Sequence, residues 1–289
     1  MKISELLKQN RRTLSFEVFP PKTDTGLDDV RRAAERIAAL GPAFISVTYG
    51  AGGNGSRYTL EIARHVQGSY GIPALAHLTC VGMTKSGARE AIGRLQDAGI
   101  ENVMALRGDL PAGMTPSQQA AGDYPHASDL IAELKAEGFC VGGACYPEIH
   151  PESASQADDL AGLRRKAEAG CDFLTTQMFF DNDVLYSFLY RLRESGVFLP
   201  VLPGVMPITN AGQLDRALRL SQAFMPQRFR RLVDRFGSDP AAMRQAGVVY
   251  AAGQAVDLYA SGIQNVHVYT MNKPEVAEGI LGSLSSLLG

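Results

Sequence analysis

The sequence alternates short apolar runs, rich in β-branched and aromatic residues, with amphipathic helical segments along its whole length. Strands separated by helices pair in parallel through right-handed crossovers. Eight strand–helix units within 289 residues fit a closed barrel better than an open sheet. We therefore predict an α/β fold, a (β/α)8 TIM barrel, as a single domain over residues 1–289. The expected strands are Leu14–Phe19, Phe44–Gly50, Ala74–Cys80, Asn102–Asp109, Cys140–Pro147, Phe173–Phe180, Phe198–Val205 and Asn265–Thr270.

Glycines mark the ends of several expected helices, which is the usual stop before a loop that leads into a strand. They are Gly41, Gly99, Gly138, Gly170 and Gly196. Extra helical sequence, roughly residues 226–261, lies between the last two expected strands. We expect it to pack over the barrel or against a neighbouring subunit.

Charge and hydropathy exclude several classes of partner. The formal net charge of −2 gives no reason to expect a nucleic acid. No apolar run is long enough to cross a membrane. The N-terminal MKISELLKQNRR lacks the apolar core and cleavage site of a secretory signal, so we expect a cytoplasmic protein.

The cysteines and histidines show no local metal-binding or disulfide pattern. The four cysteines form no CxxC pair and are expected to be reduced thiols, most of them in buried strands. The five histidines do not fall at metal-ligand spacing, and we expect no metal.

Polar residues gather at the carboxyl ends of the expected strands, which is where barrels of this kind carry their chemistry. Glu17 is a lone carboxylate in the apolar run LSFEVF. An unpaired carboxyl group in such surroundings holds its proton tightly, which suits a general acid. Alternatively, Glu17 is a structural residue satisfied by Arg107 or another cation. Arg107 and Asp109 share a face of their strand, so they form either part of a site or a structural ion pair.

Three further segments can be interpreted from their sequence patterns. Residues 50–55 match the dinucleotide-binding pattern GxGxxG, but no acidic residue ends the next strand, so we interpret them as a loop over the site. The long loop 110–124 is either a lid or a disordered excursion. Asp159, Arg165 and Lys166 lie on one expected helix and, from the pattern alone, form a solvated charged face.

Taken together, eight segments resemble the methylenetetrahydrofolate reductase family, in its compact bacterial form with the catalytic barrel alone. They occur in the family's order and span the chain, which makes the resemblance specific. The segments are SFEVFPPK, SVTYGAGG, AHLTC, ALRGDLP, YPEIHPES continuing through Arg164-Arg165-Lys166, TTQMFFD, LPGVMPITN and HVYTMNK.

The resemblance implies a flavin-dependent oxidoreductase with FAD as cofactor. Electrons from NADH or NADPH would reduce 5,10-methylenetetrahydrofolate to 5-methyltetrahydrofolate by a ping-pong mechanism, and the product would supply methyl groups for methionine synthesis. Glu17 matches the acid that protonates the bridging nitrogen of the folate, and Asp109 matches the carboxylate that stabilises the resulting cation. Gln177 matches the residue that fixes the pterin and contacts the nicotinamide nucleotide. We also expect a homo-oligomer.

The resemblance also implies the remaining binding positions. Glu17, Thr48 and Asp109 match substrate-binding positions, as do Gln177, Gln213 and Lys273. The positions that match the flavin-binding set are Thr48, Tyr49, Ala51, His77, Arg107, Gly108, Asp109, Ala127, Tyr146, His150, Asp159, Arg165 and Lys166. Arg165 and Lys166 would bind the diphosphate with charge-assisted hydrogen bonds.

Some positions depart from the family pattern. Lys273 stands where arginine is common, His126 where tyrosine is common and Gly162 where asparagine is common. The loop after Ala51 also differs, so no contact beyond that residue is carried over from the family.

Three other functions remain as alternatives. Another flavin-binding barrel, similar to proline dehydrogenase, would not need Glu17. An aldolase on the same scaffold would need a lysine inside a strand, and the expected strands contain none. A barrel that only binds a partner would carry no flavin.

Overall fold

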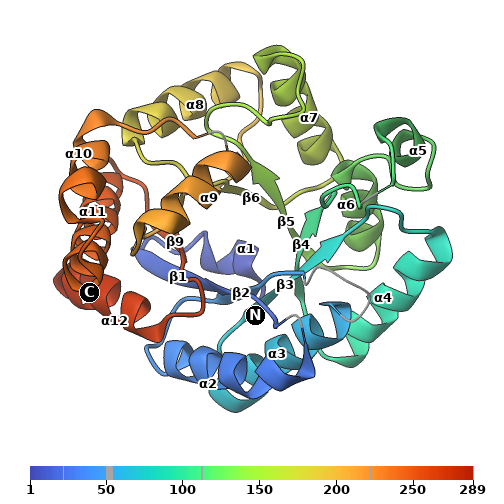
Figure 1. Cartoon of the computed structure of the whole chain (residues 1–289). Helices are drawn as coiled ribbons and strands as arrows, with labels where there is room; N and C mark the ends of the chain where they lie inside the picture. Colours follow the sequence, from blue (N-terminus) through green and yellow to red (C-terminus); the bar gives the residue numbers. More distant parts are fainter. Residues whose placement is uncertain (22, 50–54, 112, 222, 289) are drawn as a thin grey trace.

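The computed structural model shows parallel strands curved into one barrel and surrounded by helices (Figure 1). It describes residues 1–21, 23–49, 55–111, 113–221 and 223–288. Within these residues, nine strands pair in the order β7-β6-β5-β4-β3-β2-β1-β9-β8, every neighbouring pair parallel. The predicted TIM-barrel fold is therefore confirmed. The strands are β1 (Thr13–Val18), β2 (Ile45–Val47), β3 (Ala74–Thr79), β4 (Asn102–Leu106), β5 (Cys140–Cys145), β6 (Phe173–Thr176), β7 (Val201–Leu202), β8 (Gly204–Val205) and β9 (Asn265–Tyr269).

The predicted seventh strand is divided in two at Pro203. The first part, β7, pairs with β6, and the second part, β8, pairs with β9. Proline has no N–H to donate to a strand neighbour, which accounts for the break. Its carbonyl still accepts a hydrogen bond from the His267 N–H at 2.9 Å, so this segment links the two ends of the sheet.

Helices alternate with the strands and surround them (Figure 1). Their apolar faces pack on the outside of the strands in one continuous core that includes Phe16, Ile37, Val103 and Leu185. The helices are α1 (Ile3–Leu6), the 3-10 turn η1 (Asp24–Gly26), α2 (Leu27–Ala38), α3 (Gly55–Tyr70), α4 (Lys85–Asp97), α5 (Pro116–Ala120), α6 (Ala127–Ala136), α7 (Gln156–Glu168), α8 (Asn182–Glu194), α9 (Ala211–Ser221), α10 (Gln227–Phe236), α11 (Pro240–Ala260) and α12 (Pro274–Leu288).

The extra helical sequence forms α10 and α11, and α11 takes a place in the outer ring. It packs against α12, α8 and the strands β8 and β9. Gly247 allows α11 to pack closely against the backbone of Ile208, because a Cβ at position 247 would lie only 1.9 Å from the Ile208 carbonyl oxygen. The expectation that this insertion packs on the barrel is confirmed for α11.

The segment 110–124 is held to the barrel by its own short helix, α5. The buried side chain of Gln119 accepts a hydrogen bond from the Gly82 N–H at 3.0 Å and donates one to the Tyr124 carbonyl at 2.7 Å. A capping box at Thr115 and Gln118 begins the helix. In the described part of this segment, α5 and these two hydrogen bonds give the chain a defined structure, unlike the alternative of a disordered excursion.

The barrel has a closed end and an open end. At the closed end, the side chain of Ile3 from α1 packs among residues at the strand starts, including Phe44, Leu75 and Phe173. The Ile3 N–H donates to the Asn102 side-chain oxygen at 2.8 Å. The four cysteines are all free and buried, as predicted. The open end lies at the carboxyl ends of the strands.

Candidate active site

A cavity of about 1420 Å³ opens at the carboxyl ends of the strands. Residues from β1, β3, β4, β5, β6 and β9, and from the loops that follow the strands, line it. Most of the predicted site residues lie on its wall although they are far apart in the sequence. They are Glu17, Thr48, Tyr49, His77, Arg107, Gly108, Asp109, Ala127, Tyr146, His150, Asp159, Arg165, Lys166 and Gln177.

Three predicted residues are not placed on this wall. Ala51 lies outside the described residues. Gln213 and Lys273 do not line the cavity, but the structure brings them together at Thr209. The Lys273 ammonium donates to the Thr209 hydroxyl at 2.8 Å, and the Thr209 N–H donates to the Gln213 side-chain oxygen at 3.0 Å.

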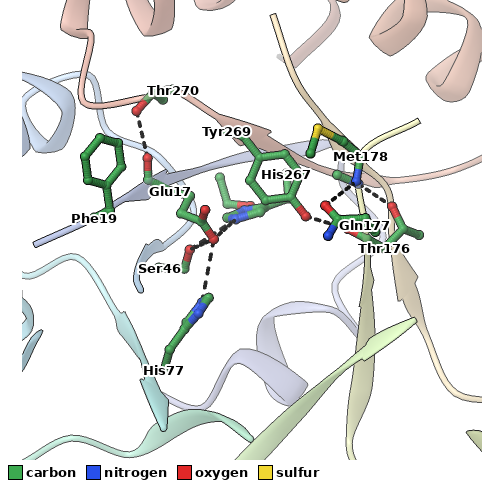
Figure 2. Close-up of polar contacts among 12 residues, drawn as sticks. Glu17, Phe19, Ser46, His77, Thr176, Gln177, Met178, His267, Tyr269 and Thr270 are labelled. Carbon is green, nitrogen blue, oxygen red and sulfur yellow. Dashed lines mark hydrogen bonds and ion pairs between the residues drawn. The ribbon is translucent and has the colours of Figure 1, made fainter. Parts of the chain in front are cut away.

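Glu17 lies near the end of β1 with its side chain 19% exposed. Figure 2 shows its carboxylate among Ser46, His77 and His267. The Ser46 hydroxyl lies 3.2 Å from Oε2, and the Nε2 atoms of His77 and His267 lie 3.7 Å and 3.9 Å from it. The alternative in which Arg107 satisfies this carboxylate is therefore wrong, because the nearest partners come from the neighbouring strands β2, β3 and β9.

His77 is a buried histidine whose Nε2 has no hydrogen bond to the described residues and points toward the Glu17 carboxylate, 3.7 Å away (Figure 2). Burial lowers the pKa of His77 to about 4, while the charge of Glu17 opposes this shift. The imidazole is consequently neutral at pH 7. The neutral ring therefore lies beside the Glu17 carboxylate without placing a cation there.

Arg107 forms its ion pair with Glu152 and not with Asp109. Both terminal nitrogens contact the Glu152 carboxylate, one of them at 2.8 Å, and Nε donates to the Gly108 carbonyl at 3.0 Å. The hydrogen bond with Glu152 raises the pKa of Arg107. This pairing corrects the alternative of a structural Arg107–Asp109 pair and leaves Asp109 exposed at the cavity.

Arg107, Gly108 and Asp109 lie beyond the end of β4, although they were predicted to lie within a strand. Gly108 adopts φ of +88°, and a Cβ there would lie 3.0 Å from side-chain carbons of Thr79 and Val81. Both observations require glycine. The turn ends the strand and directs the residues on either side of it toward the open end of the barrel.

The loop after β5 places two rings on the cavity wall. Tyr146 and His150 meet edge to face, with ring centroids 4.6 Å apart. Burial raises the pKa of Tyr146, and a hydrogen bond with Gln177 opposes this shift. Gln177 itself is held by its backbone, whose N–H donates to the Cys145 carbonyl at 2.7 Å.

Helix α7 directs a charged face toward the cavity instead of toward solvent alone. Asp159 and Lys166 are half-buried, and burial raises the pKa of Asp159 and lowers that of Lys166. The Lys166 ammonium donates to the Ala144 carbonyl at 2.6 Å, whereas Arg165 is exposed. The interpretation of this segment as a fully solvated charged face is therefore wrong.

Sequence reasoning missed four residues that contact the predicted site. Ser46, His267 and Tyr269 surround Glu17 or the neighbouring wall, and Glu152 binds Arg107. A signal existed for two of them. His267 and Tyr269 are two positions apart on β9, so they share one face of the strand, and that face points into the barrel.

Comparisons with known proteins agree with this arrangement. The family model for methylenetetrahydrofolate reductase matches residues 2–285. The chain belongs to the methylenetetrahydrofolate reductase family. It is 32% identical to the 5,10-methylenetetrahydrofolate reductase of Pectobacterium carotovorum, over 96% of this chain and 91% of the relative. It is 35% identical to "Methylenetetrahydrofolate reductase (NADH) 1" of Zea mays, over 98% of this chain.

The chain spans about half the length of the plant members of the methylenetetrahydrofolate reductase family that it matches. Among solved structures, a Clostridium thermocellum protein that binds two copies of 5-methyl-5,6,7,8-tetrahydrofolic acid has the same fold. Its TM-score is 0.64, its sequence identity is 13%, and the match covers 99% of each chain.

The described residues of this family member lack two features of other protein classes. None of the helices there is both long and apolar enough to cross a membrane. No group of three or more histidine, cysteine or acidic side chains in the same residues could hold a metal ion.

Proposed function

We propose that this protein reduces 5,10-methylenetetrahydrofolate to 5-methyltetrahydrofolate with electrons from NADH or NADPH, through bound FAD. The reaction would be ping-pong, with the two substrates using one face of the cavity in turn. We further propose that the enzyme is a cytoplasmic homo-oligomer that supplies methyl groups for methionine synthesis. The observation that carries the proposal is the position of Glu17, a carboxyl group at the wall of a large cavity in a barrel of this family.

The residues around the cavity fit a flavin dinucleotide. Its volume of about 1420 Å³ exceeds the ~300–1000 Å³ usual for small-ligand sites, so it has room for an extended molecule. Arg165 and Lys166 offer cationic donors for a diphosphate. His77 has a buried nitrogen without a partner, and the left-handed turn at Gly108 leaves the wall without a side chain at that point.

Bound FAD would supply the transfer of the hydride from the nicotinamide to the folate. The residues of the protein would bind and position the flavin and the folate. Thr48, Tyr49, Ala51, Ala127, Tyr146, His150 and Asp159 would bind the flavin together with the residues named above. Gln213 and Lys273, which meet at Thr209, would hold the folate.

Glu17, Asp109 and Gln177 would act on the folate. Glu17 would donate a proton to the bridging nitrogen, so that the nitrogen leaves carbon as a neutral amine and the five-membered ring opens. Asp109, exposed at the cavity, would stabilise the cation that results. Gln177 would fix the pterin and, in the other half-reaction, contact the nicotinamide.

The names of relatives support the substrates. The plant relatives are named as NADH enzymes, which makes NADH the first nucleotide to test. The Clostridium thermocellum protein of the same fold binds 5-methyl-5,6,7,8-tetrahydrofolic acid, which supports the proposal that this protein binds a reduced folate.

The test is the Glu17→Gln variant, which keeps size and hydrogen bonding but has no carboxylic proton. It should be yellow, and NADH or NADPH should bleach it at a near-normal rate. Its reoxidation by methylenetetrahydrofolate should fall by at least ~10²-fold, the usual scale of a positioned general acid. Stopped-flow measurements separate the two half-reactions.

Glu168→Gln, on the exposed face of α7, is the matched control and should leave both rates unchanged. Normal reoxidation of Glu17→Gln by the folate would reject Glu17 as the acid. A colourless wild-type protein that binds no added FAD would reject the flavin mechanism and favour an aldolase or a binding protein on this scaffold.

A further inference from the structure

The turn between β9 and α12, residues 270–273, holds its backbone in an unusual conformation at the open end of the barrel. Within the described residues, the non-glycine residues with positive φ are Met271 and Asn272, each with φ of +55°. Most side chains are strained in this left-handed region, although asparagine tolerates it better than methionine does. Strain of this kind persists only where the surroundings fix the backbone, so this turn is held by contacts that outweigh the strain.

The side chain of Asn272 binds both polar backbone groups of Phe19, the residue that follows β1. The Phe19 N–H donates to Oδ1 of Asn272 at 2.9 Å, and Nδ2 donates to the Phe19 carbonyl at 2.8 Å. The parallel pairing of β1 with β9 ends at Glu17 and Tyr269, because the backbone after β9 turns away. The carboxamide therefore takes the place of a peptide group of β9 and continues the bonding of β1 beyond the end of the strand.

Two neighbours of Asn272 connect the turn to the two parts of the candidate site that are proposed to act on the folate. The hydroxyl of Thr270, which is 1% exposed, donates to the carbonyl of Glu17 at 2.7 Å (Figure 2). The ammonium of Lys273 donates to the Thr209 hydroxyl at 2.8 Å. The turn thus joins the end of β1, which carries the proposed acid, to the corner proposed to hold the folate.

We propose that Asn272 is a positioning residue for the folate half-reaction. It holds the end of β1, and with it the backbone of Glu17, at a fixed place relative to Lys273. The proposal rests on the proposed function, in which Glu17 protonates the folate that Lys273 holds. A substrate bound at one point reaches an acid at another only if the two points keep their separation, and a misplacement of about 1 Å can slow a reaction by ~10²-fold.

The position of Asn272 predicts that it affects one half-reaction and not the other. Among the described residues, its side-chain hydrogen bonds go to Phe19 alone. The residues proposed to bind the flavin come from other elements, such as Arg107 after β4 and Lys166 on α7. Reduction of the flavin by a nicotinamide also needs no proton from Glu17. A defect confined to folate-dependent reoxidation therefore identifies a positioning role, whereas a general loosening of the barrel would slow both half-reactions.

The first test measures whether the two bonds hold Phe19 in solution. In Asn272→Gly the left-handed backbone is unstrained, so the turn keeps its shape while the carboxamide is lost. The amide hydrogen of Phe19 should then exchange with solvent roughly 10-fold faster, the scale of one lost hydrogen bond. Exchange is followed by NMR in holoenzyme labelled with 15N-phenylalanine, with the Phe19 signal assigned by its absence in Phe19→Leu. An unchanged exchange rate would overturn the proposal.

The second test separates the two half-reactions by stopped flow. Asn272→Gly should keep its FAD and be reduced by NADH or NADPH at the wild-type rate. Its reoxidation at saturating methylenetetrahydrofolate should fall by about 10- to 100-fold, because the acid is misplaced.

Thr270→Val loses the bond to the Glu17 carbonyl with little change of size. It should show the same selective loss, and it provides the test if Asn272→Gly does not fold. Equal slowing of both half-reactions, or a normal folate half-reaction despite faster exchange at Phe19, would overturn the proposal.

Asn102→Ala is the matched control, because Asn102 makes the same kind of bonds at the closed end of the barrel. Its Oδ1 accepts the Ile3 N–H at 2.8 Å, and its Nδ2 donates to the Ala74 carbonyl at 3.3 Å. The variant should unfold at a lower urea concentration, yet keep both rates and the exchange rate at Phe19. A selective loss of the folate half-reaction in Asn102→Ala would reject a special role of Asn272, since any lost asparagine bond would then have this effect.

Failure of this proposal can be distinguished from failure of the proposed function. If Glu17→Gln reoxidises slowly with the folate and Asn272→Gly does so at the wild-type rate, Glu17 remains the acid and Asn272 does not position it. If Glu17→Gln reoxidises normally, the proposed role of Glu17 is rejected, and the role of Asn272 is rejected with it.

Discussion

At the scale of single residues, burial shifts the pKa of several groups on the wall of the cavity toward the neutral form. His77 is the clearest of these, since its imidazole lies beside Glu17 and its pKa is lowered to about 4. It therefore contributes no positive charge at neutral pH. Glu17 keeps a polar environment without a permanent cation, which is the condition that a proton donor requires.

The lowered pKa of His77 predicts a specific dependence of stability on pH. Unfolded histidine titrates near pH 6.5, so below that pH the unfolded state takes up a proton that the folded state refuses. The free energy of unfolding should fall by up to about 3 kcal/mol as the pH drops from 6.5 to 4. His77→Gln should remove this loss and show a flatter profile over that window.

Urea unfolding of the flavin-free protein at several pH values measures the effect. His126→Gln, which replaces an exposed histidine, should keep the wild-type profile. If the wild type and His77→Gln lose stability equally between pH 6.5 and pH 4, the buried imidazole is charged in the folded protein.

Residues of the site could be predicted from the sequence better than the residues that contact them. Glu17 could be found because it is a carboxylate in an apolar strand, and such a pattern is local. Its contact with Ser46 crosses to the next strand, 29 positions away, and the contact between Arg107 and Glu152 spans 45 positions. No periodicity within a strand contains that information, which depends on the register of the closed sheet.

At the scale of elements, α7 shows how one helix serves both the core and the cavity. Ser155 caps its start by accepting the Asp158 N–H, and Leu163 faces the core. Asp159 and Lys166 lie toward the cavity near opposite ends of the helix. The acidic group near the start and the basic groups near the end both complement the helix dipole.

Replacing Arg165 and Lys166 together by alanine should yield folded but mostly colourless protein. Each lost charge-assisted bond is worth roughly 1.5–3 kcal/mol, so FAD affinity should fall by about 10²- to 10⁴-fold. Titration of the flavin-free protein with FAD measures it. Arg164→Ala removes a neighbouring charge that bonds the Ser195 carbonyl instead, and it should keep its flavin. Full retention of FAD by the double variant would show that these residues do not bind the diphosphate.

The elements could be predicted from the sequence, but their ends could not. Alternation of strands and helices identified each strand, because buried parallel strands are apolar throughout. The predicted strands nevertheless ran too far at their carboxyl ends, as at Arg107 and Gln177. Gln177 still donates one backbone hydrogen bond to Cys145 of β5, whereas the Arg107 side chain bonds Glu152 and the Gly108 carbonyl. The sequence does not show at which residue the hydrogen bonds between neighbouring strands end.

At the scale of the whole molecule, the barrel separates stability from chemistry. The cavity lies at the carboxyl ends of the strands, and the packed layer under α1 lies at the other end. The division at Pro203 and the linking bond to His267 complete the cylinder between them. The closed cylinder could be predicted from the number of repeats. The packing of α1 against the strand starts at the closed end could not be predicted, because α1 is only four residues long.

This separation predicts that weakening the packing of α1 at the closed end does not slow the reaction. Ile3 is fully buried between Phe44, Leu75 and Met104, so Ile3→Ala should leave a cavity at the closed end. The free energy of unfolding should fall by about 2–5 kcal/mol, the usual range for such truncations in a core. Urea unfolding measures that loss, and Val249→Ala, at a 62% exposed position, should stay within about 0.5 kcal/mol of the wild type. Below the unfolding transition, both variants should bind FAD and reoxidise with the folate at wild-type rates. A slower folate half-reaction in Ile3→Ala, at full flavin content, would mean that packing at the closed end reaches Glu17 through the interior of the barrel.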